Sequence, residues 1–237
     1  MLLLILLLSL VTPALQVQPS AAKQLTGAWE VSLPDGTQGL WIIEDDHFSI
    51  TYYKTATPEF INTEGGKWSL TKDGNIDLQW EFNTRDPELV GQRQALAYKL
   101  QDNTLVAGGK SWKRIDNGTP GELKGAWLIT GREQSGKMNA MTPGARKTMK
   151  ILSGTRFQWI AYNSETGDFF GTGGGSYTTR DGKYTENIEF FSRDNARVGA
   201  SLDFNYELRD GKWHHSGNNS KGEPLYEIWS TRQSVGI

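Results

Sequence analysis

The chain has 237 residues, with 25 Lys and Arg against 27 Asp and Glu, so its formal net charge is -2. This near neutrality argues against a nucleic-acid-binding protein, because such proteins usually carry a basic excess. The sequence contains no cysteine, which excludes disulfides, thiolate nucleophiles and cysteine-ligated metal centres. With 27 glycines and 11% aromatic residues, the composition favours β structure.

The N-terminus begins with an apolar segment. Residues 2–10 are apolar except for Ser9, and this run is too short to span a bilayer as a helix, which takes about 20 residues. Small residues follow it, and cleavage after Ala14 or Ala22 suits a signal peptidase. We therefore predict a signal peptide over residues 1–22, a secreted or periplasmic mature protein, and no membrane span.

An internal repeat divides the rest of the chain. Residues 25–29 (LTGAW) recur as 123–127 (LKGAW), and later segments match in the same order. The later matches pair 42–43 with 151–152, 80–82 with 188–190, 90–91 with 198–199, and Trp112 and Arg114 with Trp229 and Arg232. The sequence thus predicts two tandem copies, 25–116 and 122–233, joined by a linker at 117–121.

Each copy has the residue alternation of a β meander. Asp181-Gly182 and Asp210-Gly211 lie between alternating segments, which is a strong hairpin signal. The strands predicted in the second copy are 123–130, 146–152, 156–162, 168–179, 183–192, 197–208, 212–217 and 224–232. Eight such strands can close into a barrel that holds side chains or one small ligand. The predicted fold class is therefore all-β, with two tandem eight-stranded up-and-down antiparallel β-barrels.

A Gly-x-Trp on the first strand and an Arg near the end of the last strand occur in both copies. The residues are Gly27, Trp29 and Arg114 in the first copy, and Gly125, Trp127 and Arg232 in the second. This pattern resembles the lipocalins (calycins), and the second copy, with residues 156–159 (RFQW) and the glycine run 173–175, resembles lipocalin-like exported proteins of Bacteroidota. The resemblance implies that the Trp closes one barrel end, that the Arg packs across it, and that the barrel tends to bind small molecules. Such a fold does not by itself define a function.

The two copies differ in length at two connections. The second copy has extra residues at 131–145 and again within 214–221. In a meander these connections lie at the same end, so both insertions are expected to crowd one mouth of the second barrel. Since loops at one end of a rigid scaffold often carry function, we predict a ligand site in the second copy and a structural role for the first.

The alternation also predicts which side chains face the lumen. Glu186 is in phase with the apolar side of its strand, whereas the first copy has Leu78 at that position and Ala107 at the position of His215. The predicted ligand-binding residues are Trp159, Tyr184, Glu186, Tyr206, Trp213 and His215. Aromatic walls with a few polar groups are typical of a small-molecule cavity, and we expect a sugar or a small amphipathic ligand. The alternatives for Glu186 are exposure to solvent or pairing with an arginine.

Two other function classes stay open. Glu186 and His215 could serve a hydrolase- or isomerase-type enzyme if they converge on one cavity, and the methionine-containing loop 131–145 could bind another protein. His214 and His215 are adjacent and should point to opposite faces of a strand, so they cannot chelate one metal ion. We find no phosphate-binding or dinucleotide motif and predict no metal and no cofactor.

Overall fold

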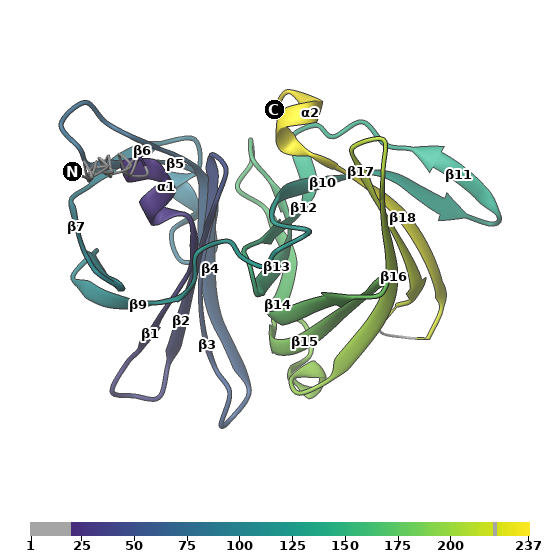
Figure 1. The fold of residues 1–237 in the computed structure, drawn as a ribbon, viewed down its shortest axis with the longest axis horizontal. Coiled ribbons are helices and arrows are strands. Elements are labelled where there is room, and N and C mark those ends of the chain that lie inside the picture. Colours follow the sequence, from purple (N-terminus) through teal and green to yellow (C-terminus); the bar gives the residue numbers. More distant parts are fainter. Residues whose placement is uncertain (1–19, 220–221) are drawn as a thin grey trace, which may run out of the picture.

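The computed structural model describes residues 20–219 and 222–237, which form two β-barrels lying side by side (Figure 1). Most of the predicted signal peptide, residues 1–19, lies outside the described residues. The described part begins with the short helix α1 (Ala21–Leu25), and among these residues no helix has the length and apolar character needed to cross a membrane. The all-β, two-barrel prediction is confirmed.

The first barrel is a sheet of nine antiparallel strands in the order β6-β5-β4-β3-β2-β1-β9-β8-β7. Its strands are β1 (Gly27–Ser32), β2 (Gln38–Glu44), β3 (His47–Lys54), β4 (Glu59–Leu70), β5 (Ile76–Asn83), β6 (Arg93–Leu96), β7 (Tyr98–Gln101), β8 (Thr104–Ala107) and β9 (Lys110–Asp116), with the 3-10 helix η1 (Pro87–Leu89) before β6. Strands β6 and β7 are separated only by Ala97, and they pair with β5 and β8 respectively. The chain itself therefore closes this barrel, with one predicted strand divided into two.

The second barrel has strands β10 (Gly125–Gln134), β11 (Lys137–Ala140), β12 (Arg146–Leu152), β13 (Arg156–Asn163), β14 (Phe169–Arg180), β15 (Lys183–Phe191), β16 (Ser201–Arg209), β17 (Lys212–Asn218) and β18 (Pro224–Thr231). It is closed by pairing of β10 with β18. The insertion 131–145 is not a plain loop, because β10 extends beyond the barrel and pairs with β11 as a hairpin. Residues 197–200, predicted as the start of a strand, instead form the end of the 3-10 helix η2 (Asn195–Arg197) and the turn after it.

One predicted end-closing contact forms and the other does not. The Arg114 guanidinium lies 3.9 Å from the ring centroid of Trp29, as expected. In the second barrel the strand partner of Trp127 is Thr231, so Thr231, and not Arg232, is the structural match of Arg114. The sequence match was one residue out of register, and successive strand residues face opposite sides. Arg232 therefore points out of the second barrel, where both its terminal nitrogens bond the carboxylate of Glu81 in the first barrel.

The two barrels share a buried apolar core. Its members come from both copies: Ala28, Leu40, Ile42, Tyr53, Phe82, Ala126, Leu128, Met149, Ile151, Ile160, Tyr162 and Phe190. A separate apolar cluster lies inside each barrel, so the described residues form three cores. The outer faces of β2 and β3 pack against β12, and hydrophobic burial joins the copies into one unit.

The contact between the barrels has approximate twofold symmetry. The Tyr53 hydroxyl donates to Glu189, and its counterpart Tyr162 donates to Glu81 at 2.5 Å. Both glutamates occupy β-bulges of matching register, in which an extra residue lies opposite a two-glycine segment of the neighbouring strand. A bulge re-aims a side chain, and here it directs each carboxylate at the tyrosine of the other barrel.

Candidate functional site

A cavity of about 530 Å³ opens at the mouth of the second barrel. Residues from the longer connections surround its entrance, including Arg132, Arg146, Arg193, Asn219 and Pro224. Its size falls within the range of small-molecule sites, which is roughly 300–1,000 Å³. The cavity therefore lies at the end of the barrel where the insertions were predicted to gather.

A buried ion pair forms one side of the cavity. Lys150 on β12 donates from Nζ to Oε1 of Glu186 on β15 at 2.7 Å, and the two side chains are only 7% and 5% exposed. The ammonium group also lies within 4.9–5.8 Å of the ring centroids of Tyr184, Phe204, Trp213 and Trp229. A cation over aromatic faces is attracted by the ring quadrupoles. The carboxylate and the rings together compensate for the removal of Lys150 from water.

A second polar group lies on β17 and β18. Nδ1 of His215 is 3.4 Å from Oε2 of Glu227, which also accepts from Nε1 of Trp229 at 3.1 Å. Oε1 of Glu227 accepts from Arg132 at 2.6 Å. The other ring nitrogen of His215, Nε2, is buried and has no hydrogen-bond partner in the described part of the chain.

Burial and the nearby charge of Lys150 lower the pKa of His215. Burial alone would raise the pKa of Glu227, but the hydrogen bond from His215 and the charges of Lys150 and Arg132 lower it to about 2. At neutral pH the site therefore holds an ionised Glu227 and a neutral imidazole. With Nδ1–H directed at Glu227, the lone pair of His215 is on Nε2.

The six predicted site residues fall into three groups. Trp159, Glu186 and His215 line the cavity. Tyr184 and Trp213 are fully buried and lie beneath it, 5.1 Å apart between ring centroids, where both contact Lys150. Tyr206 is not part of the cavity lining, because its hydroxyl bonds Glu122 near the opposite end of the barrel. Neither alternative for Glu186 holds, since its side chain is buried and its partner is Lys150 and not an arginine.

Three further polar residues of the site were missed by the sequence analysis: Lys150, Glu227 and Arg132. Lys150 lies in a strand whose next residues, Ile151 and Leu152, are buried and apolar. A comparison of the copies could have found it, because Trp127 is paired with Lys150 and the equivalent Trp29 is paired with Trp41. The sequence signal for Lys150 was therefore that the second copy has lysine at a register position where the first copy has tryptophan.

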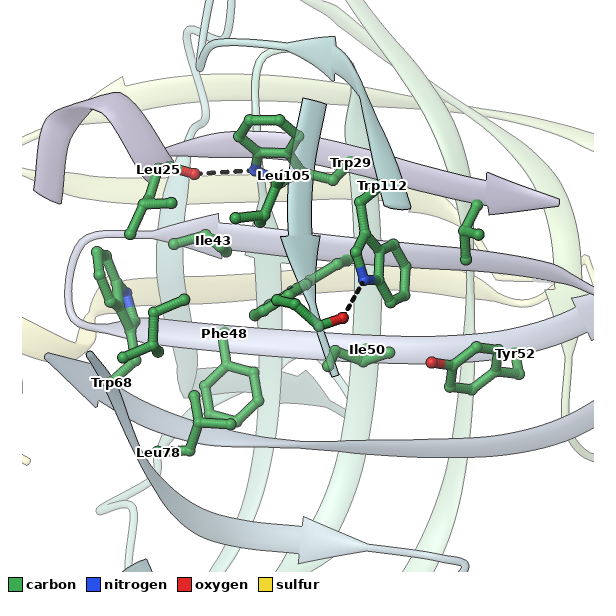
Figure 2. Packing of buried hydrophobic residues seen from close by; sticks show 14 of the residues in the cluster. Leu25, Trp29, Ile43, Phe48, Ile50, Tyr52, Trp68, Leu78, Leu105 and Trp112 are labelled. Carbon is green, nitrogen blue, oxygen red and sulfur yellow. Dashed lines mark hydrogen bonds between the residues drawn. The ribbon is translucent and has the colours of Figure 1, made fainter. Parts of the chain in front are cut away.

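The first barrel has the same register but a different interior. It has Trp41, Leu78, Ala107 and Lys110 where the second barrel has Lys150, Glu186, His215 and Glu227. Trp41 packs edge-on against Trp112 with centroids 5.4 Å apart, and Figure 2 shows the neighbouring Tyr52, Leu78 and Trp112 within this apolar cluster. Only about 160 Å³ of cavity is left. The two lumens therefore differ in both volume and polarity.

Fold and site together define a two-barrel β protein with one lumen that aromatic side chains largely fill and one lumen that is open. In the described ranges, no three His, Asp or Glu side chains are placed to hold a metal ion. Residues 122–233 match the family described as Domain of unknown function (DUF4488). No curated protein matches the chain. The family match covers the copy that contains the open cavity.

Proposed function

We propose that this protein binds a small molecule in the cavity of its second barrel and that the first barrel is its structural partner. The observation that carries the proposal is the contrast between the lumens, since one scaffold is filled by Trp41 and Tyr52 in the first copy and left open in the second. Buried charges are costly and are retained where they serve a purpose beyond packing. A sugar or a small amphipathic molecule suits the aromatic walls and polar groups of this cavity.

The geometry favours binding over the two alternatives. Glu186 bonds Lys150 and His215 bonds Glu227, so the predicted acid–base pair is divided between different partners. The segment 131–145 does expose Met138 and Met141, at 38% and 41%. A protein-binding role would not require an open lumen, whereas ligand binding does.

The proposal is tested by filling the cavity. Ala161 lines it, and the first barrel has Tyr52 at that register position. Ala161→Tyr should therefore weaken binding of the neutral fluorescent probe N-phenyl-1-naphthylamine at least about tenfold, because the new ring occupies the site. Ala95→Tyr, at an exposed position of the first barrel, is the matched control and should bind as the unaltered protein does. Equal binding by both variants would place any site elsewhere.

We also infer that the protein acts outside the cytoplasm. The apolar run at 2–10 and the small residues after it support export by a cleaved signal peptide. Mass spectrometry of the protein expressed from its full sequence should then find a chain beginning after Ala14 or Ala22. Recovery of the intact N-terminus from the exporting host would contradict this proposal.

A further inference from the structure

Two arginines at the mouth of the cavity have no carboxylate partner among the described ion pairs. They are Arg146, at the start of β12, and Arg193, in the connection after β15. We propose, on the basis of the proposed function, that the ligand of the second barrel is a small aromatic anion whose charged group meets these two guanidinium groups.

Both arginines converge on Phe170. The Arg146 guanidinium carbon lies 4.5 Å from the Phe170 ring centroid, and Nε of Arg193 donates to the Phe170 carbonyl oxygen at 2.7 Å. Both side chains remain exposed to solvent. Each guanidinium group has five N–H donors in a planar fork that matches a carboxylate or sulfonate. The backbone and ring contacts hold the two forks in place while leaving donors for a ligand.

The charges lining the cavity leave a positive excess at its mouth. Arg132 is neutralised by Glu227 and Lys150 by Glu186. Among the residues that line the cavity, this leaves two cations, Arg146 and Arg193, and one carboxylate, the exposed Glu133. The whole chain, in contrast, has a net charge of -2. A local excess of one sign beside a concave site raises the concentration and the association rate of the opposite charge.

The first barrel provides an internal comparison. Its Arg85 follows β5 as Arg193 follows β15, but Arg85 is directed at the buried carboxylate of Glu64 at 3.4 Å. At the register position of this glutamate the second barrel has Gly173, next to the bulge, and glycine carries no carboxylate. Arg85 is thus neutralised within the first lumen, whereas its counterpart Arg193 is available to bind an anionic group in the second.

Aromatic side chains line the same cavity as the two guanidinium groups. Trp159 and Phe191 meet edge to face with centroids 5.6 Å apart, and both line the cavity. Gly173 permits this contact, since a Cβ there would lie 2.7 Å from both rings. Ring faces with cations above them suit a flat aromatic ligand that carries an anionic group. Long alkyl chains suit the site less well, because the lumen below contains the Lys150–Glu186 ion pair.

Two probes that share one ring skeleton test the ligand class. The full chain is titrated with 8-anilinonaphthalene-1-sulfonate and with N-phenyl-1-naphthylamine, which has the same rings but no sulfonate. The anionic probe should bind about tenfold more tightly, and added NaCl should weaken only its binding. In the variant Arg146→Gln/Arg193→Gln this preference should disappear, with the affinity for the neutral probe unchanged within about twofold.

The control variant removes the same charge from the opposite end of the barrel. Arg180→Gln/Arg209→Gln changes two exposed arginines at the ends of β14 and β16 and should keep the preference for the anionic probe. Equal affinities for both probes in the unaltered protein, or an equal loss in both double variants, would overturn the inference and leave the proposed binding function intact. If neither probe binds the unaltered protein, the proposed function itself is overturned.

Discussion

Removing one partner of the buried Lys150–Glu186 pair should destabilise the second barrel. The informative change is Glu186→Leu, because the first barrel has Leu78 at this position and shows that the fold accepts it. In this variant the Lys150 side chain, which is only 7% exposed, loses its carboxylate partner. A buried charge without a partner is far more costly than a neutral pair of the same volume.

The size of the loss follows from the geometry. With an effective dielectric constant of about 20, unit charges separated by the observed 2.7 Å attract by about 6 kcal/mol. Two effects reduce the cost of losing this attraction. The four rings around Nζ still stabilise the cation by about 2 kcal/mol, and taking the proton off a lysine at pH 7 costs no more than about 5 kcal/mol. We therefore expect a loss of about 3–5 kcal/mol.

Thermal unfolding followed by tryptophan fluorescence measures this loss. For a chain of this size, 1 kcal/mol corresponds to about 2–4 °C, so Glu186→Leu should lower Tm by about 6–20 °C. The control is Lys150→Met/Glu186→Leu, which removes both charges and should recover most of the stability. A loss below about 1 kcal/mol for the single variant, or no recovery in the double variant, would refute the reasoning.

Three other changes test separate parts of the structure. Burial raises the pKa of Glu44 to about 8, so protonation of this carboxyl contributes its full stability below about pH 4.5, and that contribution is lost as the pH rises to about 8. Glu44→Gln should therefore melt like the unaltered protein at pH 4 but be more stable at pH 9, by up to about 5 kcal/mol. Equal melting of the two proteins at both pH values would contradict this. Tyr162→Phe removes the hydrogen bond to Glu81 and should lower the unfolding free energy measured in urea by about 1.5–3 kcal/mol. An unchanged urea midpoint of unfolding would show that this bond contributes nothing. Gly175→Ala places a Cβ 2.1 Å from the carbonyl oxygen of Asn187 at a φ of 154°. The unfolding free energy in the same assay should therefore fall by about 1–3 kcal/mol or more. An unchanged unfolding free energy would argue against the bulge geometry.

Local pattern was sufficient to predict most of the fold. Alternation and Asp-Gly turns predicted β15 and its neighbours to within one or two residues at most ends, because both signals act between nearby residues. One feature depended on a contact distant in sequence. The outward direction of Arg232 is fixed by Glu81 in the other copy, and no local signal contains that information. The hairpin β10–β11, in contrast, pairs residues three to nine positions apart around Ser135-Gly136, so its signal was local and was missed.

The candidate site was predictable in part for the same reason. Glu186 and His215 were predicted because each puts a polar side chain on the apolar side of its strand, where the first copy has Leu78 and Ala107. Lys150 and Glu227 are the charged partners of these two residues. Lys150 on β12 and Glu186 on β15 belong to strands that are not neighbours in the sheet, so this pair forms only when the sheet curls into a barrel. His215 and Glu227 lie directly opposite each other on the neighbouring strands β17 and β18, so comparing the positions paired across this hairpin could have predicted their contact.

The symmetric contact between the barrels has a consequence for how the two lumens came to differ. Tyr53 and Tyr162 serve the same role on either side of the contact, as they would in a dimer of identical subunits. In such a dimer each substitution occurs twice, so both lumens must be open or both filled. A single polypeptide removes that restriction, and here Trp41 fills one lumen while Lys150 occupies its place in the other. Tandem fusion thus allows one lumen to be filled while the other stays open.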